Sequence, residues 1–168
     1  MDSVPAKSCV LDKDAVKRKL RRMALEVAEH NAEETELIIA AINGNGEIVA
    51  KKLLEELKDV SPFYLRKISV VLDKKDPLTV YTEPAIDLEN KVVLIVDDVA
   101  NTGKTMMYAL KPFLFTHVKK IQTLVLVERS HKLFPIQTDY AGLSIATTLQ
   151  EHISVETEKE EITGAWLD

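Results

Sequence analysis

The feature that most constrains the fold is a series of short apolar runs separated by segments with helical periodicity. The runs have the length and composition of buried parallel strands, and they cover residues 37–42, 92–96 and 121–127. Helical spacing of apolar residues, or a position directly after such a run, indicates helices over residues 14–31, 47–58 and 104–115. This alternation predicts an α/β fold, a doubly wound, mostly parallel sheet flanked by helices, with ligands at the carboxyl ends of its strands. We expect one domain, residues 1–168.

The remaining segments carry weaker patterns. Residues 64–72 are rich in β-formers, and residues 73–87 form a polar connection with at most a short hairpin. Pro112 is expected to shorten or kink the helix that contains it. The same patterns predict a lead-in segment at 1–11, a polar turn at 97–103 and a last edge strand at 165–167.

Composition excludes several classes of protein. The 22 Lys and Arg residues against 27 Asp and Glu give a net charge of −5, which argues against non-specific binding to nucleic acid or to anionic membranes. Cys9 is the single cysteine, so a reducing compartment is expected. No apolar run approaches the roughly 20 residues of a membrane helix, and residues 1–9 lack the apolar core of a secretory signal. We therefore expect a cytoplasmic protein without a membrane segment.

The strongest functional signal is the stretch from Val92 to Thr105. An apolar strand is followed by two adjacent carboxylates, Asp97 and Asp98, and then by a short turn at the expected start of a helix. The backbone N–H groups of such a turn, its threonine hydroxyls and the close approach that Gly103 allows can hold a phosphate group. Carboxylates instead accept hydrogen bonds from hydroxyl groups. Phosphate beside a diol indicates a ribose 5-phosphate.

Two other nucleotide-binding motifs do not fit this sequence. A Walker A loop requires a glycine five residues before Gly103, and Asp98 occupies that position. The dinucleotide fingerprint requires glycine or alanine three residues after Gly46, where the chain has Val49. The alternative that stays open is a strand-ending turn with a helix cap and no ligand.

The stretch from Val92 to Thr105 resembles the phosphoribosyl diphosphate signature of type I phosphoribosyltransferases. The resemblance implies that Asp97 and Asp98 contact the ribose hydroxyls. The residues implied to hold the 5-phosphate are Ala100, Asn101, Thr102, Gly103, Lys104 and Thr105. The implied reaction transfers ribose 5-phosphate from phosphoribosyl diphosphate to a nucleobase and releases diphosphate. Mg²⁺ is the implied cofactor, and no dedicated cluster of metal ligands is expected because Mg²⁺ keeps few protein ligands.

The resemblance extends to one branch of the family, the bifunctional pyrimidine operon attenuators and uracil phosphoribosyltransferases. It covers residues 10–155, and the segment 127–142 is similar to the small hood of that branch. The candidates for the base end of the pocket are Arg129, His131 and Lys132. The alternative for these three is a set of solvated loop charges. The implied partners are a pyrimidine-type base or a nucleoside monophosphate, and a second copy of the chain in a homodimer or higher homo-oligomer.

The first glycine turn is expected to hold the diphosphate through its backbone N–H groups. It consists of Asn43, Gly44, Asn45 and Gly46. The family usually has Lys and Arg in this turn, and the connection at 73–87 is shorter than the loop that closes over the reaction in the pyrimidine branch. These features leave a second hypothesis open: a nucleotide-sensing regulator with little or no turnover.

A basic helix face carries a third hypothesis. Lys17, Arg18, Arg21 and Arg22 share one side of the helix at 14–31. Such a face is usually solvated. The pyrimidine branch binds messenger RNA through this region, so RNA binding remains a secondary possibility that the acidic composition disfavours.

Overall fold

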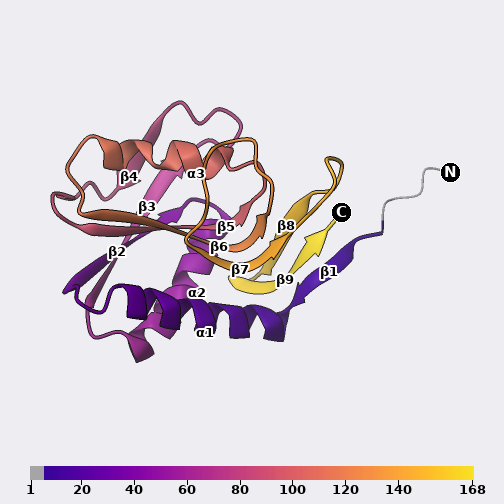
Figure 1. Cartoon of the computed structure of the whole chain (residues 1–168), viewed down its shortest axis with the longest axis horizontal. Helices are drawn as coiled ribbons and strands as arrows, with labels where there is room; N and C mark the ends of the chain where they lie inside the picture. The colour runs from indigo at the N-terminus through magenta and orange to yellow at the C-terminus, as the bar shows by residue number, and fades with distance from the viewer. Residues whose placement is uncertain (1–5) are drawn as a thin grey trace.

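The computed structural model describes residues 6–168, which alternate between strands and helices for most of their length (Figure 1). The helices are α1 (Lys13–His30), α2 (Asn45–Val60), α3 (Lys104–Ala109) and the 3-10 helix η1 (Lys111–Leu114). The strands are β1 (Ser8–Asp12), β2 (Glu36–Ile42), β3 (Tyr64–Leu72), β4 (Val80–Glu83), β5 (Val92–Ala100), β6 (Lys120–Arg129), β7 (Tyr140–Ile145), β8 (Ile153–Glu158) and β9 (Glu161–Leu167). None of the described helices is long and apolar enough to cross a membrane.

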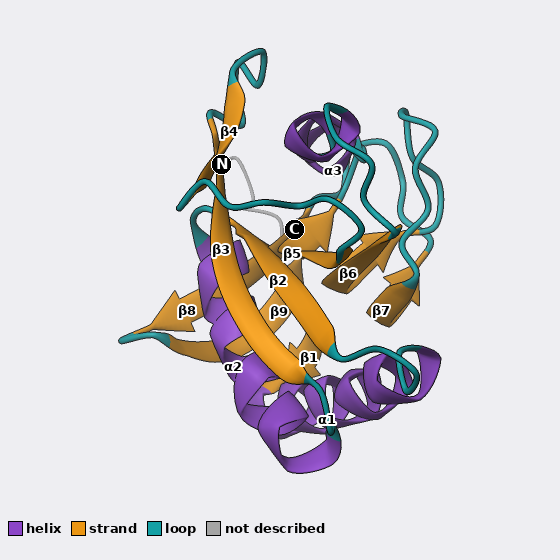
Figure 2. Cartoon of the chain, turned by 90° about the vertical axis from the view of Figure 1, so that its left-hand side faces the viewer, coloured by secondary structure: helices purple, strands orange, loops and turns teal. Residues whose placement is uncertain are grey.

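The main sheet has six strands in the order β4-β3-β2-β5-β6-β7. Strands β3, β2, β5, β6 and β7 are parallel, and β4 runs antiparallel to β3 at one edge. Helices α1 and α2 cover one face of this sheet, whereas α3 lies on the opposite face (Figure 2). The predicted doubly wound, mostly parallel α/β fold is therefore confirmed.

Strand alternation divides the apolar interior into two cores. Residues 37, 39 and 41 of β2 join the core beneath α1 and α2, and residues 38, 40 and 42 join the core beneath α3. Helix α1 turns a buried stripe towards the first core, and its start is capped by Asp12, whose side chain accepts a hydrogen bond from the Ala15 N–H at 2.7 Å. Both faces of the sheet are thus buried, as its continuous apolar strands require.

A second, antiparallel sheet forms the small hood, in the order β1-β9-β8. Two expectations were wrong here. Residues 165–167 belong to the central strand of this sheet, because β9 pairs with β1 on one side and with β8 on the other. The segment 127–142, expected in the hood, instead supplies the end of β6, a loop and the start of β7, and its strand residues pair within the main sheet.

The ends of the chain and of β5 also differ from expectation. Part of the lead-in predicted at 1–11 is β1, and its first five residues lie outside the described range. The polar turn predicted at 97–103 starts only after Ala100, because β5 continues beside β6 as far as the pair Ala100 and Glu128. Pro112 shortens the helix as predicted. Helix α3 ends at Ala109, and the chain then forms the separate 3-10 helix η1, which contains Pro112.

Candidate functional site

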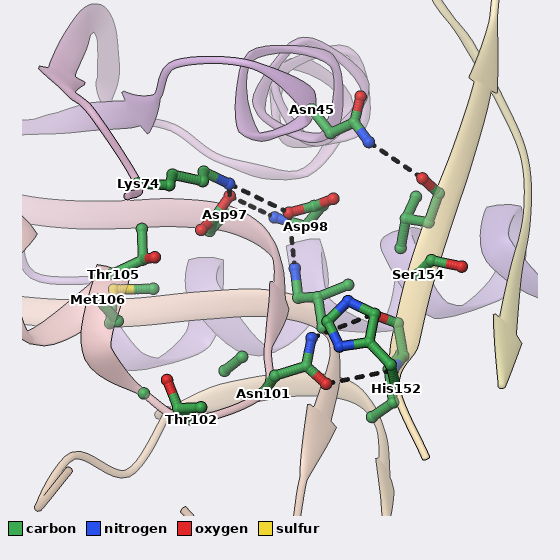
Figure 3. Close-up of a pocket in the computed structure, with 15 residues that line it drawn as sticks. Asn45, Lys74, Asp97, Asp98, Asn101, Thr102, Thr105, Met106, His152 and Ser154 are labelled. Atoms are coloured by element: carbon green, nitrogen blue, oxygen red, sulfur yellow. Dashed lines mark hydrogen bonds and ion pairs between the residues drawn. The ribbon is translucent and has the colours of Figure 1, made fainter. Parts of the chain in front are cut away.

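The main candidate site lies where the direction of chain winding reverses in the sheet. From β2 the chain continues through α2 to β3 on one side, and from β5 it continues through α3 to β6 on the other side. Adjacent strands that part in this way leave a crevice at their carboxyl ends, which is where open α/β sheets bind ligands. A cavity of about 380 Å³ occupies this position, a volume suited to a small-molecule ligand (Figure 3).

Four chain segments line the cavity. They are the start of α2, the loop after β3, the end of β5 with the turn that follows, and the start of β8. Of the residues selected from the sequence, this cavity brings together Asn45, Asp97, Asp98, Ala100, Asn101, Thr102, Gly103 and Thr105. Residues far apart in the sequence therefore face one space, as the sequence interpretation requires of a ligand site.

Asp97 and Asp98 form the buried floor of the cavity. Their side chains are 2% and 12% exposed, and each accepts a hydrogen bond at 2.9 Å from the N–H of the following residue. Lys74 Nζ lies 3.4 Å from Asp97 Oδ1 and 3.8 Å from Asp98 Oδ1. Burial raises the pKa of Asp97 from 3.8 to about 8, the negative charge of Asp98 adds to this effect, and Lys74 opposes it.

The first glycine turn packs directly against this floor. A Cβ atom on Gly46 would lie only 3.0 Å from Asp97 Oδ1, so glycine lets the start of α2 approach the carboxylate. Gly44 has φ +91° and opens the helix without a side-chain cap. Asn43 is turned away from the ligand space, since its Oδ1 accepts the N–H of Leu72 at 3.0 Å. Asn45 is the residue of this turn that lines the cavity, whereas Asn43, Gly44 and Gly46 lie outside the lining.

The turn after β5 is supported from behind by the loop between β6 and β7. The carbonyl of Thr102 accepts the N–H groups of both Leu133 and Phe134 at 3.0 Å. Gly103 has φ +82°, and a Cβ atom there would meet Ile136 at 2.8 Å. Lys104 begins α3 and does not line the cavity. Its backbone N–H donates a hydrogen bond to Thr102 Oγ1 at 3.2 Å. The loop between β6 and β7 therefore fixes the shape of the turn whose backbone and threonines face the cavity.

Two asparagines tie the hood strand β8 to the cavity rim. The Asn101 side chain donates to the Ile153 carbonyl at 3.0 Å and accepts the Ile153 N–H at 3.2 Å. Asn45 donates to the Val155 carbonyl at 3.0 Å and accepts from the Thr157 hydroxyl at 3.3 Å. These contacts hold the outer edge of β8 across from β5 (Figure 3). The side chains of both asparagines are thus engaged with protein.

The structure places Arg129, His131 and Lys132 away from the main cavity. Arg129 donates to the Glu151 carbonyl at 2.5 Å, and His131 is exposed in the loop after β6. Lys132, 8% exposed, pairs with Glu128 at 2.9 Å and lines a different cavity beside the buttressing loop. The loop after β6 folds back over the start of α3. This path places the three basic side chains behind the turn that follows β5 and away from the cavity.

Sequence reasoning missed two parts of the lining. Lys74 and the segment that runs from His152 into the start of β8 face the cavity but were not selected. The position of Lys74, two residues after a predicted strand whose end lies beside β2, was an available signal. No local signal marks β8, because its approach to β5 depends on the hood sheet.

The geometry combines three chemical functions. The acid pair can accept hydrogen bonds from hydroxyls, and the turn at residues 100–105 can donate backbone and hydroxyl hydrogen bonds to an anion. The start of α2 presents a second set of backbone donors at the carboxylates. One space can therefore hold a diol between two anionic groups.

Comparison with known proteins gives the family. The phosphoribosyl transferase domain model matches residues 8–160. The bifunctional protein PyrR of Pelotomaculum thermopropionicum is 33% identical over 94% of this chain and 92% of its own, and that of Clostridium acetobutylicum is 32% identical over 89% of each.

Solved structures agree at the level of the fold. The hypoxanthine phosphoribosyltransferase of Trypanosoma cruzi aligns with a TM-score of 0.78 and 14% identity, covering 94% of this chain and 95% of that chain. A hypoxanthine-guanine-xanthine phosphoribosyltransferase aligns with a TM-score of 0.65 and 21% identity, over 87% of this chain and 82% of that chain. The acid pair, the turn behind it and these matches place the chain in the type I phosphoribosyltransferase family, where it is similar to the bifunctional PyrR proteins.

Proposed function

We propose that this phosphoribosyltransferase moves ribose 5-phosphate from phosphoribosyl diphosphate to a pyrimidine-type base and releases diphosphate. The observation that carries the proposal is the presence of Asp97, Asp98 and the turn at residues 100–105 around one cavity at the switch point of the sheet. The choice of a pyrimidine rests on the sequence resemblance to the pyrimidine branch and on the PyrR relatives.

The proposed arrangement follows from charge and hydrogen-bonding capacity. The 5-phosphate sits in the turn, where Thr102 and Thr105 add hydroxyl donors to the backbone N–H groups. The ribose hydroxyls meet Asp97 and Asp98, and the diphosphate lies towards the start of α2. The base then faces His152 and the first three residues of β8, which form the remaining wall.

The reaction forms a bond between a ring nitrogen of the base and C1 of the sugar while the bond from C1 to the diphosphate oxygen breaks. Substitution at an anomeric carbon passes through a transition state with positive charge on the sugar ring. The buried acid pair lies beside that ring and favours the developing charge. The protein acts mainly by positioning the base and sugar. Holding the two reactants in line lowers the entropic part of the activation free energy.

The donor set fits Mg²⁺ carried by the substrate. Mg²⁺ is usually held by one or two carboxylates together with substrate phosphates and several waters. Asp97 and Asp98 supply two carboxyl groups at the cavity floor, and a bound cation would favour their ionised form. No cluster of three or more His, Cys, Asp or Glu side chains suited to a metal occurs within residues 6–168. When bound, the ion would offset the negative charge of the departing diphosphate.

The proposal is tested with the acid pair. Calorimetry with ribose 5-phosphate and an assay of diphosphate release are run on the wild type, on the double variant that combines Asp97→Asn with Asp98→Asn, and on the exposed control Asp76→Asn. We expect the double variant of the acid pair to lose sugar binding and turnover, with Asp76→Asn like the wild type. Full activity in the double variant would remove the assigned role.

A nucleotide-sensing function is the second candidate, and the engaged asparagines favour it. Asn43 and Asn45 take the place where the family usually has cations, and both side chains bond to protein backbone instead. A sensor would bind uridine monophosphate in calorimetry and release no diphosphate with any base. Turnover with uracil would reject it in favour of the transferase.

A further inference from the structure

The cavity wall formed by β8 is the outer edge of the hood sheet. Among the described strands, β8 pairs with β9 on one side and has no strand partner on the side that faces the cavity. Side chains bind the backbone of this edge instead. Asn101 binds the N–H and the carbonyl of Ile153, and Asn45 binds the carbonyl of Val155 (Figure 3). The two asparagines thus take the place of a neighbouring strand.

Asn45 links this edge to the start of α2. It is the first residue of the helix and follows Gly44, whose φ of +91° opens the helix without a side-chain cap. Its Nδ2 donates to the Val155 carbonyl at 3.0 Å, and its Oδ1 accepts the Thr157 hydroxyl at 3.3 Å. Both polar atoms of the amide are therefore bonded to β8.

The amide of asparagine suits this link because it donates and accepts at the same time. Lysine and arginine carry only donors, so neither could accept the Thr157 hydroxyl. Asn45 lines the cavity, yet its side chain is engaged with the strand across from it. An anion at the start of α2 would therefore meet backbone N–H groups of the helix and not this amide.

The two ends of the proposed ligand rest on different supports. The sugar phosphate faces Asp97, Asp98 and the turn that follows, and β5 holds these residues within the main sheet beside β6. The base faces a wall whose edge is held by side chains. A weaker hold on β8 therefore changes the base end and leaves the sugar end in place.

Resting on the proposed function, we infer that Asn45 is a positioning residue for the base. Its amide holds β8 against the start of α2 and so sets the width of the base end of the cavity. The side chain contributes nothing to binding of the diphosphate, although it stands in the turn expected to hold that group. The inference thus assigns the amide of this turn to base recognition.

Three ligands separate this role from a direct contact with the diphosphate. Calorimetry in the presence of Mg²⁺ compares ribose 5-phosphate, phosphoribosyl diphosphate and uridine monophosphate on the wild type and Asn45→Ala. The variant loses two hydrogen bonds to β8, so we expect uridine monophosphate to bind about tenfold more weakly. The two ligands without a base should bind like the wild type. In turnover, the KM for uracil should rise by the same factor while the KM for phosphoribosyl diphosphate stays unchanged.

Thr157 tests the same link from the other side. Its hydroxyl donates to Asn45, and the residue lies outside the cavity lining. Thr157→Val should weaken uridine monophosphate by about threefold. Combined with Asn45→Ala it should add no further loss, because both changes break one connection. Thr163→Val is the matched control: its hydroxyl donates to the Glu156 carbonyl of β8 at 3.1 Å, a bond that does not involve Asn45, and all three ligands should bind normally.

Thermal unfolding of each variant verifies that the fold is intact. Weaker binding of phosphoribosyl diphosphate by Asn45→Ala, alone or together with uridine monophosphate, would show a direct contact with the diphosphate or a general loosening. Either result, or no change with any ligand, would overturn the inference and leave the proposed function standing. A wild type that does not bind uridine monophosphate would overturn both.

Discussion

At the scale of single residues, Asp97 is tightly constrained by its surroundings. Its carboxyl is almost fully buried between the start of α2 and the end of β5, beside a second carboxylate. With a pKa raised to about 8, it carries a proton through much of the neutral range. A protonated carboxyl both donates and accepts hydrogen bonds, which suits a ligand hydroxyl that does the same.

This burial predicts a pH dependence of stability. Between its ordinary value of 3.8 and about 8, Asp97 is protonated in the folded state and ionised in the unfolded state. The folded state binds more protons, so this group makes the free energy of unfolding fall as pH rises through that window. Asp97→Asn removes the effect. Thermal denaturation from pH 5 to pH 9 should show the variant gaining melting temperature over the wild type as pH rises, and parallel profiles would contradict this.

Gly103 predicts a second residue-scale effect. An alanine there must adopt φ +82°, at a cost of about 1–2 kcal/mol, and its Cβ meets Ile136 at 2.8 Å. The matched control is the same substitution in an Ile136→Ala background, where the backbone cost remains but the closest contact of the new Cβ is gone. Urea denaturation should show a larger loss of unfolding free energy for Gly103→Ala in the wild type than in the Ile136→Ala background. An equal or smaller loss would show that the loop between β6 and β7 moves to accommodate the new Cβ.

At the scale of elements, the cavity depends on how β8 is held against β5. The hood sheet reaches the main sheet at this point through the Asn101 and Asn45 side chains. Ion pairs such as Lys52 with Glu161 at 2.5 Å fasten the β8–β9 hairpin to α2 at the surface, where such pairs contribute little. The position of the cavity wall therefore rests on these two amides together with the buried side chains of Ile153 and Val155.

Asn101→Ala should loosen this wall. The substitution removes two hydrogen bonds to Ile153, each worth about 0.5–1.5 kcal/mol. Local opening of β8 should become about tenfold or more frequent, measured as faster hydrogen exchange of the Ile153 amide. Asn43→Ala, which loses its bond to the Leu72 N–H at the far side of the turn, should leave that exchange unchanged. Unchanged exchange in Asn101→Ala would mean that the apolar core alone holds the strand.

The elements that the sequence predicted well are those with a strong local pattern. Strand β2 is continuously apolar, and α1 has its buried residues at helical spacing, so periodicity located both. The length of β5 was underestimated, because carboxylates are poor strand formers and their pairing with β6 is a tertiary effect. The hood could not be predicted, since β1 and β9 come from opposite ends of the chain.

At the scale of the whole molecule, the candidate site forms at the carboxyl ends of the strands of the main sheet. Some of the segments that build it can be recognised in the sequence, and others cannot. Asp97, Asp98 and the turn that follows are contiguous, so they could be selected together from the sequence. Lys74 and β8 arrive through the strand order and the hood, which depend on long-range pairing. Conversely, Lys132 was selected as a base contact, but it pairs with Glu128 behind the turn that follows β5.

The most direct test of the central claim is a crystal structure of the protein with ribose 5-phosphate. The account predicts the phosphate against the backbone N–H groups and threonines of residues 100–105, with the ribose hydroxyls within hydrogen-bond distance of Asp97 and Asp98. Sugar phosphate bound at another surface, or this cavity closed by packed side chains at saturating ligand, would contradict it.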